Sequence, residues 1–152
     1  NDPCQPLRSP KIWGVQVGIR KQETGNRRKD KRYMATKDHR DLVVWQKSMD
    51  LVEEVFRLTK LLPKEELFGI TSQLRRSAFS IPSNIAEGNA RNSDKEYARF
   101  LSIARGSKAE TETQLEICVR IGYFTEAQTH KSVALCDEIG KMLYKMIHKL
   151  SQ

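Results

Sequence analysis

Apolar residues recur at every third or fourth position in four successive segments of this chain. That spacing follows the 3.6-residue turn of an α-helix and lays one apolar stripe along each helix. It predicts helices over residues 41–62, 64–88 and 94–121, and a fourth that follows Thr125 and continues to the end of the chain. No segment shows the alternation that predicts a β-strand. Because the connections are short, we predict an all-α fold, an antiparallel up-down-up-down four-helix bundle.

The core side of each predicted helix follows from its apolar stripe. In the first helix the stripe is Leu42, Trp45, Met49, Val52 and Phe56, widened by Val55, Leu58 and Leu62. In the second it is Leu67, Ile70, Leu74, Ala78, Ile81 and Ile85. In the third it is Tyr97, Phe100, Leu101, Ala104, Thr111, Leu115, Cys118 and Val119. In the fourth it is Val133, Cys136, Ile139, Leu143, Met146, Ile147 and Leu150.

Polar residues mark the ends of these helices. Asp38 or Asp41 can accept the free N–H groups of the first helix. Ser93 followed by Glu96, and Thr125 followed by Gln128, have the spacing of a capping box. Pro63 ends the first helix and can open the second at its first turn.

Pro82 lies inside the apolar pattern of the second helix. A proline there removes one backbone hydrogen bond and costs about 3 kcal/mol or more unless the surroundings compensate. The helix either kinks at Pro82 or stops near Ser80 and restarts with Asn84 as its cap. We favour a continuous, kinked helix because Ile81 and Ile85 keep the phase that Leu74 sets.

Positive charge is concentrated in the first 33 residues. The whole chain has a formal net charge of +8. Residues 1–33 hold nine Lys/Arg against three Asp/Glu, a net of +6, which leaves +2 for residues 34–152. The first segment also lacks a sustained helical period, so we interpret 1–33 as a disordered or non-native basic leader and 34–152 as the bundle domain. Met34 is then the natural start, and the alternative is a basic arm that binds nucleic acid.

The three cysteines, Cys4, Cys118 and Cys136, show no metal-binding spacing and are odd in number. Cys118 and Cys136 fall in predicted helices, where they are interpreted as small core residues. This usage favours a reducing, cytoplasmic location. No apolar run approaches the ~20 residues that span a bilayer.

Two helices carry small or apolar residues outside their core stripes. In the second helix Phe79, Ser83 and Ala86 lie on the side opposite Leu74. In the third helix Ile103, Ile117 and Ile121 form a second apolar stripe. A single bundle needs one stripe per helix, so these six residues predict a homo-oligomer interface. The alternative is that they are ordinary scattered exposed apolar residues.

Basic residues gather in the second and third helices. Residues 69–109 hold seven Lys/Arg against three Asp/Glu, a net of +4, and five of the seven are arginines. Arginine is well suited to bidentate contact with phosphate. Candidate nucleic-acid contacts are Arg75, Arg76, Arg91, Lys95, Arg99 and Arg105, with ion pairing between subunits as the alternative. A second row in the fourth helix, Lys141, Lys145 and Lys149, fits the helix dipole and a solvated surface.

Lys108 is unusual because it falls on the core-facing side of the third helix, beside Gly106 and Ser107. It is expected either to extend its ammonium group to solvent or to pair with Glu112.

Catalytic and metal-binding signatures are lacking in the sequence. None of the three histidines lies three residues after a glutamate, so the di-iron pattern of helical bundles is missing. Phosphate-loop, dinucleotide-binding, HExxH and GxSxG motifs are also missing. We predict no catalytic residue, no metal and no cofactor.

Four segments carry a family resemblance: DLVVWQKSMDLV (41–52), ITSQLRRSAFSIPSNIAEGNAR (70–91), EYARFLSIARGSKAETETQL (96–115) and IGYF (121–124). They resemble the four-helix-bundle proteins encoded in intervening sequences of bacterial 23S ribosomal RNA genes. The accessory variability protein of diversity-generating retroelements is similar in fold. The resemblance implies a homopentamer with a basic surface and no enzymatic activity. It implies RNA or other nucleic acid as partner, with a protein-binding scaffold or accessory subunit of a nucleic-acid enzyme, such as a reverse transcriptase, as the alternative.

Overall fold

The computed structural model describes residues 38–152. Within that range it contains four α-helices, two short 3₁₀ helices and no strand, which confirms the predicted all-α fold with four helices. The predicted leader 1–33 and Met34 lie outside the described residues. The elements are η1 (His39–Asp41), α1 (Val43–Thr59), η2 (Lys64–Glu66), α2 (Ile70–Asn89), α3 (Asp94–Arg120) and α4 (Glu126–Leu150).

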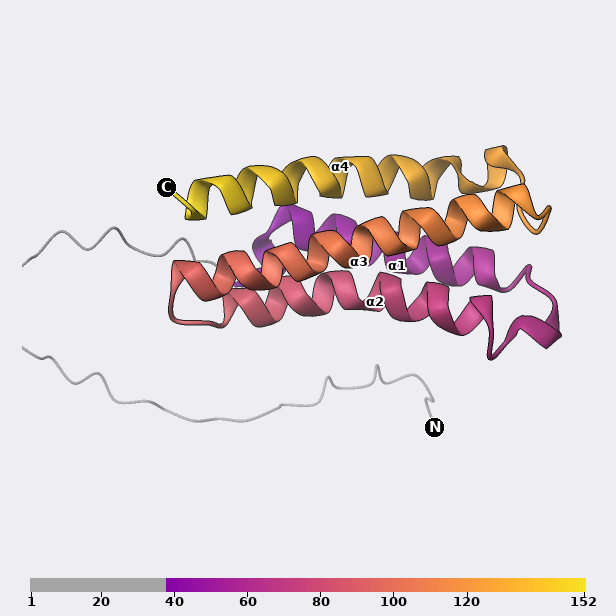
Figure 1. The fold of residues 1–152 in the computed structure, drawn as a ribbon, viewed down its shortest axis with the longest axis horizontal. Helices are drawn as coiled ribbons and strands as arrows, with labels where there is room; N and C mark the ends of the chain where they lie inside the picture. The colour runs from indigo at the N-terminus through magenta and orange to yellow at the C-terminus, as the bar shows by residue number, and fades with distance from the viewer. Residues whose placement is uncertain (1–37) are drawn as a thin grey trace, which may run out of the picture. The chain divides into compact units, whose positions relative to one another are not determined.

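The four long helices pack in a ring. Figure 1 shows the chain turning back after α1, α2 and α3, so that each helix lies beside the next. Contacts join α1 to α2, α2 to α3, α3 to α4 and α4 back to α1. Within residues 38–152 no Cα atoms of the diagonal pairs, α1 with α3 and α2 with α4, come within 8 Å of each other. The core therefore lies between the four helices.

The core is formed mainly by Leu, Ile and Val. Fully buried side chains include Leu51, Val55, Leu58, Leu74, Ile81, Ile85, Tyr97, Leu101, Leu115, Cys118, Cys136, Ile139 and Leu143. Three predicted core residues, Met49, Leu67 and Val133, are instead exposed. In α1 the buried side is centred on Val44, Leu51 and Val55, which places the larger rings of Trp45 and Phe56 at its edge. Because the prediction took the large aromatic side chains as the centre of the core side, it placed that side about one residue too far around the helix.

The start of the second helix was predicted wrongly. Residues 64–66 form the 3₁₀ helix η2, and α2 begins at Ile70 rather than at Lys64. Gly69 is the N-cap of α2 and has no side chain that could accept a hydrogen bond. The Glu66 carboxylate instead accepts a hydrogen bond from the Ile70 N–H, at 3.3 Å. Tyr123 donates to the other oxygen of Glu66 at 2.9 Å. The α1–α2 connection is therefore attached to the α3–α4 turn.

Helix α2 continues through Pro82, as predicted. The proline ring is buried, and side chains of the next two residues bond to carbonyls in the turn before it. Ser83 Oγ donates to the Phe79 carbonyl at 2.8 Å, and Asn84 Nδ2 donates to the Ser80 carbonyl at 2.7 Å. The carbonyl that loses its donor at Pro82 is that of Ala78, whereas these two bonds go to the following carbonyls.

Of the two predicted capping boxes, the one at Thr125 is complete, and the one at Ser93 has only the bond to the Ser93 hydroxyl. Ser93 accepts from the Glu96 N–H at 3.2 Å, and Thr125 with Gln128 forms a complete capping box. Gly122 ends α3 with a positive φ of 83°, which favours glycine. Neither predicted aspartate caps α1, because Leu42 occupies its N-cap, and Asp38 caps η1 instead.

Two of the four helix–helix interfaces, α2–α3 and α1–α4, contain different kinds of polar interaction. Between α2 and α3 lies a row of small polar groups that is largely buried: Thr111 Oγ1 lies 2.9 Å from Ser77 Oγ, and Ser107 Oγ lies 2.8 Å from the half-buried Ser80 Oγ. Within residues 38–152, both ion pairs between helices join α1 to α4. They are Lys47–Glu138 and Lys131–Glu54, the latter at 2.7 Å.

Candidate nucleic-acid interface

Two of the six predicted nucleic-acid contacts are engaged within the bundle. Arg75 donates from Nε to Thr59 Oγ1 at 2.9 Å, and its guanidinium lies 4.4 Å from the centre of the Phe56 ring. Arg91 lies 4.8 Å from the Phe100 ring centre and pairs with Glu87. These arginines fix helix packing and local geometry, so they are less available to a ligand.

The other four are exposed. Within residues 38–152, Arg76, Lys95 and Arg105 have no acidic group within 4.0 Å. Arg99 lies 3.9 Å from Glu96, the limit of an ion pair, and its side chain is highly exposed. Such an exposed pair contributes little and leaves the guanidinium free to bind phosphate.

These four residues do not form one patch. Arg76 lies on α2, on the side away from the buried Leu74. Lys95 and Arg99 lie on α3, on the same side of the helix as Ser102 and Gly106 at 100° per residue. Arg105 lies about 60° from Ser102 and about 120° from Arg99, at the edge of that face. We call Lys95, Arg99 and Arg105 the α3 basic row.

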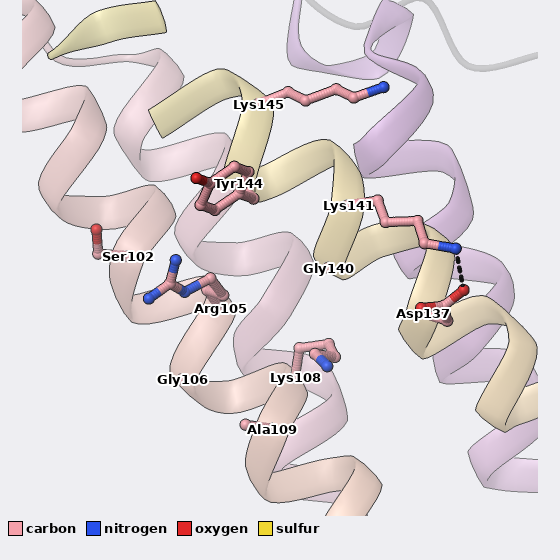
Figure 2. Close-up of a pocket in the computed structure, with 10 residues that line it drawn as sticks. All are labelled: Ser102, Arg105, Gly106, Lys108, Ala109, Asp137, Gly140, Lys141, Tyr144 and Lys145. Carbon is pink, nitrogen blue, oxygen red and sulfur yellow. Dashed lines mark hydrogen bonds and ion pairs between the residues drawn. The ribbon is translucent and has the colours of Figure 1, made fainter. Parts of the chain in front are cut away.

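A groove runs between α3 and α4 beside this row (Figure 2). Its volume is about 710 Å³. The α3 wall contributes Ser102, Arg105, Gly106, Lys108 and Ala109, and the α4 wall contributes Asp137, Gly140, Lys141, Tyr144 and Lys145. Lys141 and Lys145, for which the sequence predicts a solvated surface, are among the lining residues, and in Figure 2 both side chains extend away from Arg105.

The groove has an excess of positive charge. Lys141 pairs with Asp137 at 2.6 Å, which raises the pKa of the lysine. Lys108 pairs with Glu112 at 2.7 Å, which decides between the two predicted roles of this residue. Arg105 and Lys145 have no acidic partner within the described residues. Because Lys145 extends away from Arg105 in Figure 2, Arg105 is the uncompensated cation on the Tyr144 side of the groove.

Small residues keep the groove open. A Cβ atom built on Gly106 would meet no other atom within 4 Å, so the space beside it is empty. A Cβ atom on Gly140 would lie 3.3 Å from Lys108 Cε, because the Lys108 side chain lies against that glycine. Tyr144 is 61% exposed and, in Figure 2, extends from α4 to the same side as Arg105 of α3. An aromatic ring and a cation thus share one opening.

The six predicted interface residues are largely at the surface. Phe79, Ile103, Ile117 and Ile121 are exposed, as is Ser83, and Ala86 is half-buried. Phe79 also makes an edge-to-face contact with Phe56, with ring centres 5.4 Å apart. Sequence periodicity missed a second exposed apolar group in the α1–α2 connection, because loop residues carry no helical phase. It consists of Leu61, Leu67 and Phe68, the last 91% exposed.

Metal and thiol chemistry find no support in the part of the chain that the structure describes. No group of three metal-ligating side chains occurs among residues 38–152. Cys118 and Cys136 are buried free thiols, as expected from their place in the core stripe. Burial, reinforced by the Glu112 carboxylate, raises the pKa of Cys136 to about 12, which makes its thiol a poor nucleophile. None of the described helices is long and apolar enough to cross a membrane.

Comparison with protein families matches residues 40–145 to the 23S rRNA-intervening sequence protein family. The chain belongs to this family. The match includes α1, α2, α3 and most of α4, and with them the α3 basic row and the whole groove. This agrees with the resemblance carried by the sequence motifs.

A solved structure supports the same assignment. It is a protein of unknown function from the S23 ribosomal protein family of Bacteroides thetaiotaomicron VPI-5482. The two chains share 32% sequence identity and superpose with a TM-score of 0.65. The similarity covers 69% of this chain and 98% of the other. A comparison with curated proteins finds no significant match.

Proposed function

We propose that this chain is a non-enzymatic RNA-binding protein that acts as a homo-oligomer of antiparallel four-helix bundles in a reducing cytoplasm. The observation that carries the proposal is the α3 basic row, Lys95, Arg99 and Arg105, which is exposed and only weakly paired. Because the family is named for an intervening sequence of 23S rRNA, we propose RNA rather than DNA as the ligand.

The chemistry of the row favours backbone binding over sequence readout. Exposed lysine and arginine side chains contact phosphates and release bound counterions. Such contacts position a nucleic acid but carry no sequence information by themselves. The proposed ligand is therefore selected by charge and shape.

Oligomerisation would multiply this row. The exposed apolar residues on α2 and α3, Phe79, Ile103, Ile117 and Ile121, provide the proposed subunit contacts. A closed ring would repeat the α3 basic row once per subunit, and the family resemblance makes a pentamer the expected assembly. Several rows on one particle raise the affinity for a long RNA without any new contact within a subunit.

Salt-dependent binding of the full chain to a fluorescent single-stranded RNA tests the proposal. The slope of log affinity against log salt is negative, and each phosphate contact on a single strand contributes about −0.7 to it. The double variant Lys95→Gln/Arg99→Gln should therefore reduce the magnitude of this slope by about 1.4. The matched control Arg27→Gln/Arg28→Gln removes the same charge from the first 33 residues. A slope that changes only in the control would contradict the proposal.

The assembly is tested separately by sedimentation velocity at micromolar concentration. The wild-type chain should sediment as an oligomer, and Ile117→Lys should shift it toward the monomer because it places a charge in the proposed contact. Wild-type protein that sediments as a monomer would refute the interface.

A second function is favoured by one observation, the exposed apolar group of Leu61, Leu67 and Phe68. In this alternative the chain is a protein-binding scaffold, or an accessory subunit of a nucleic-acid enzyme such as a reverse transcriptase. It would then lack measurable RNA affinity of its own, and the arginines would serve subunit contacts. The RNA titration of the wild-type chain separates the two functions.

A further inference from the structure

We propose that the cavity at the α1–α2 connection binds a phosphate monoester, either a free phosphate ester or the phosphorylated end of an RNA strand. The cavity lies where the chain turns from α1 into α2 (Figure 1), and Arg75 is its central donor. Where the phosphate belongs to RNA, the site rests on the function proposed above and deepens it, because it adds a phosphate contact on elements other than α3.

The lining of this cavity carries positive charge and no carboxylate. Its volume is about 370 Å³, and its lining consists of Lys60, Lys64 and Arg75 with two threonines and three apolar residues. Within residues 38–152, none of the three cations has an acidic partner. Both lysines are exposed, so their flexible side chains can turn toward a bound anion. Such a lining favours an anionic ligand.

The two glutamates of the α1–α2 connection do not line the cavity. Glu66 accepts hydrogen bonds from the Ile70 N–H at 3.3 Å and from the Tyr123 hydroxyl at 2.9 Å. Glu65 is exposed. An anion that enters the cavity therefore meets no carboxylate in its lining.

Arg75 is held in place before a ligand arrives. Its Nε donates to Thr59 Oγ1 at 2.9 Å, and its guanidinium lies 4.4 Å from the centre of the Phe56 ring. Among residues 38–152 its two terminal nitrogens have no hydrogen-bond acceptor. These contacts keep Arg75 from a ligand on the outer surface of α2 but leave its paired N–H groups for a ligand in the cavity. A fixed guanidinium loses little entropy when it binds phosphate in a bidentate manner.

The start of α2 adds to the positive potential of the cavity. Thr71 lines the cavity and lies in the first turn of α2, where backbone N–H groups have no acceptor within the helix. Gly69, the N-cap, has no side chain that could accept from them. The positive end of the helix dipole and the three cations thus lie at the same cavity.

The number of donors favours a phosphate monoester. This group carries a charge of about −1.5 to −2 at pH 7 and three acceptor oxygens. Arg75 can bind two of these oxygens, and either lysine or the first turn of α2 can bind the third. A carboxylate has only two oxygens, and an internal phosphodiester has only one charge. The apolar part of the lining, Leu62, Pro63 and Leu67, leaves room for the carbon atoms of an ester.

Isothermal titration of the full chain with ribose 5-phosphate at constant ionic strength tests the site. We expect ribose 5-phosphate to bind and unphosphorylated ribose not to bind. Lys60→Gln/Lys64→Gln should weaken binding about fivefold, since two exposed charge contacts are lost. The matched control Lys29→Gln/Lys31→Gln removes two lysines from the first 33 residues and should leave the affinity unchanged.

Leu67 offers a pair of variants that differ in charge but hardly in size. This lining residue is 50% exposed, so a polar side chain at its position stays outside the core. Leu67→Glu places a carboxylate at the cavity, and Leu67→Gln places a neutral amide there. Leu67→Glu should bind ribose 5-phosphate about tenfold more weakly than Leu67→Gln because like charges repel.

Nuclear magnetic resonance of the wild-type chain tests the role of Arg75 without a substitution. The Arg75 Nε–H signal should shift when ribose 5-phosphate is added, because the same guanidinium binds the phosphate. Circular dichroism and thermal melting of every variant should match the wild type. Binding that is equal in Leu67→Glu and Leu67→Gln, with the Arg75 signal unmoved, would place the ester elsewhere and overturn the site.

A pair of RNAs distinguishes the source of the phosphate. The same oligonucleotide is titrated with a 5′-phosphate and with a 5′-hydroxyl. A preference of about tenfold for the 5′-phosphate, lost in Leu67→Glu but kept in Leu67→Gln, assigns the cavity to an RNA end. Equal affinities, with ribose 5-phosphate still bound, assign it to a free phosphate ester. Equal affinities without ribose 5-phosphate binding would overturn the site.

Failure of the cavity and failure of the RNA-binding function give different results. Lys95→Gln/Arg99→Gln should weaken both RNAs equally and leave ribose 5-phosphate binding unchanged, because neither residue lines the cavity. Weak binding of both RNAs by the wild-type chain, with ribose 5-phosphate bound and sensitive to Leu67→Glu, would contradict the RNA-binding function and support the cavity.

Discussion

The same substitution, glycine to alanine, should have opposite effects at two helical positions of this bundle. Gly88 lies in the last turn of α2, where a Cβ atom would come within 2.7 Å of Phe100 Cβ and 2.9 Å of Tyr97 Cδ2. Phe100 Cβ is attached to the α3 backbone and cannot rotate away. Gly88 thus allows α2 and α3 to approach closely, and Gly106 faces open space.

The magnitudes follow from two opposing effects. Alanine gains about 0.5–1 kcal/mol over glycine within a helix, with the lower value appropriate near the end of α2. Overpacking a tight contact costs about 1–3 kcal/mol. Gly88→Ala should therefore lose about 1.5 kcal/mol of unfolding free energy, and Gly106→Ala should gain about 0.5–1 kcal/mol.

Urea unfolding followed by circular dichroism measures both changes. With a slope of about 2 kcal/mol per molar urea, the midpoint should fall by about 0.7 M in Gly88→Ala and rise by about 0.3–0.5 M in Gly106→Ala. All samples need one protein concentration, because assembly stabilises the folded state. A Gly88→Ala midpoint at or above that of the wild type would refute the close-approach argument. A Gly106→Ala midpoint that falls as far as that of Gly88→Ala would do the same.

Three further predictions concern buried polar groups. The Lys131 ammonium and the Arg57 guanidinium lower the pKa of Glu54 in the folded protein. The ionised carboxylate therefore stabilises the fold at pH values above the unfolded-state pKa, and this stabilisation is lost as the pH falls through the lowered folded-state pKa. Glu54→Gln should thus lose about 1–2 kcal/mol at pH 7, and the difference from wild type should disappear under strongly acidic conditions in urea titrations. Cys136 should resist iodoacetamide at pH 8 in the native protein and react fully in urea, as read by peptide mass spectrometry. Thr111→Val should cost about 1–2 kcal/mol, and a double-mutant cycle with Ser77→Ala should show coupling between the two hydroxyls, whereas additive effects would contradict the bond.

Local sequence signals predicted the helices well. The capping pairs at Ser93 and Thr125 fixed the starts of α3 and α4, because a cap needs only neighbouring residues. The phase of Ile81 and Ile85 correctly indicated that α2 continues through Pro82. The start of α2 was missed, since Glu66 is held by Tyr123 from a distant turn, a contact that no local pattern contains.

The candidate site was predictable only in part. Charge density pointed to the arginines, yet the sequence cannot show that Arg75 is stacked on Phe56 while Arg105 stays exposed. The groove was missed because it depends on which helices are neighbours. One signal was available: Gly106 and Gly140 are unusual in the middle of helices, and in the structure both line the groove.

The different chemistry on the two sides of the ring has a consequence for how the bundle opens. Besides its buried apolar residues, the α1–α4 side has the ion pairs Lys47–Glu138 and Lys131–Glu54. Acid weakens these pairs by protonating the carboxylates, and salt screens them where they are exposed. The α2–α3 side depends on buried hydroxyls and close helix contact, which neither condition affects directly. In native-state hydrogen exchange, α4 should therefore lose protection before the α2–α3 hairpin. The hairpin, which contains Lys95 and Arg99, would then be the last part of the bundle to come apart.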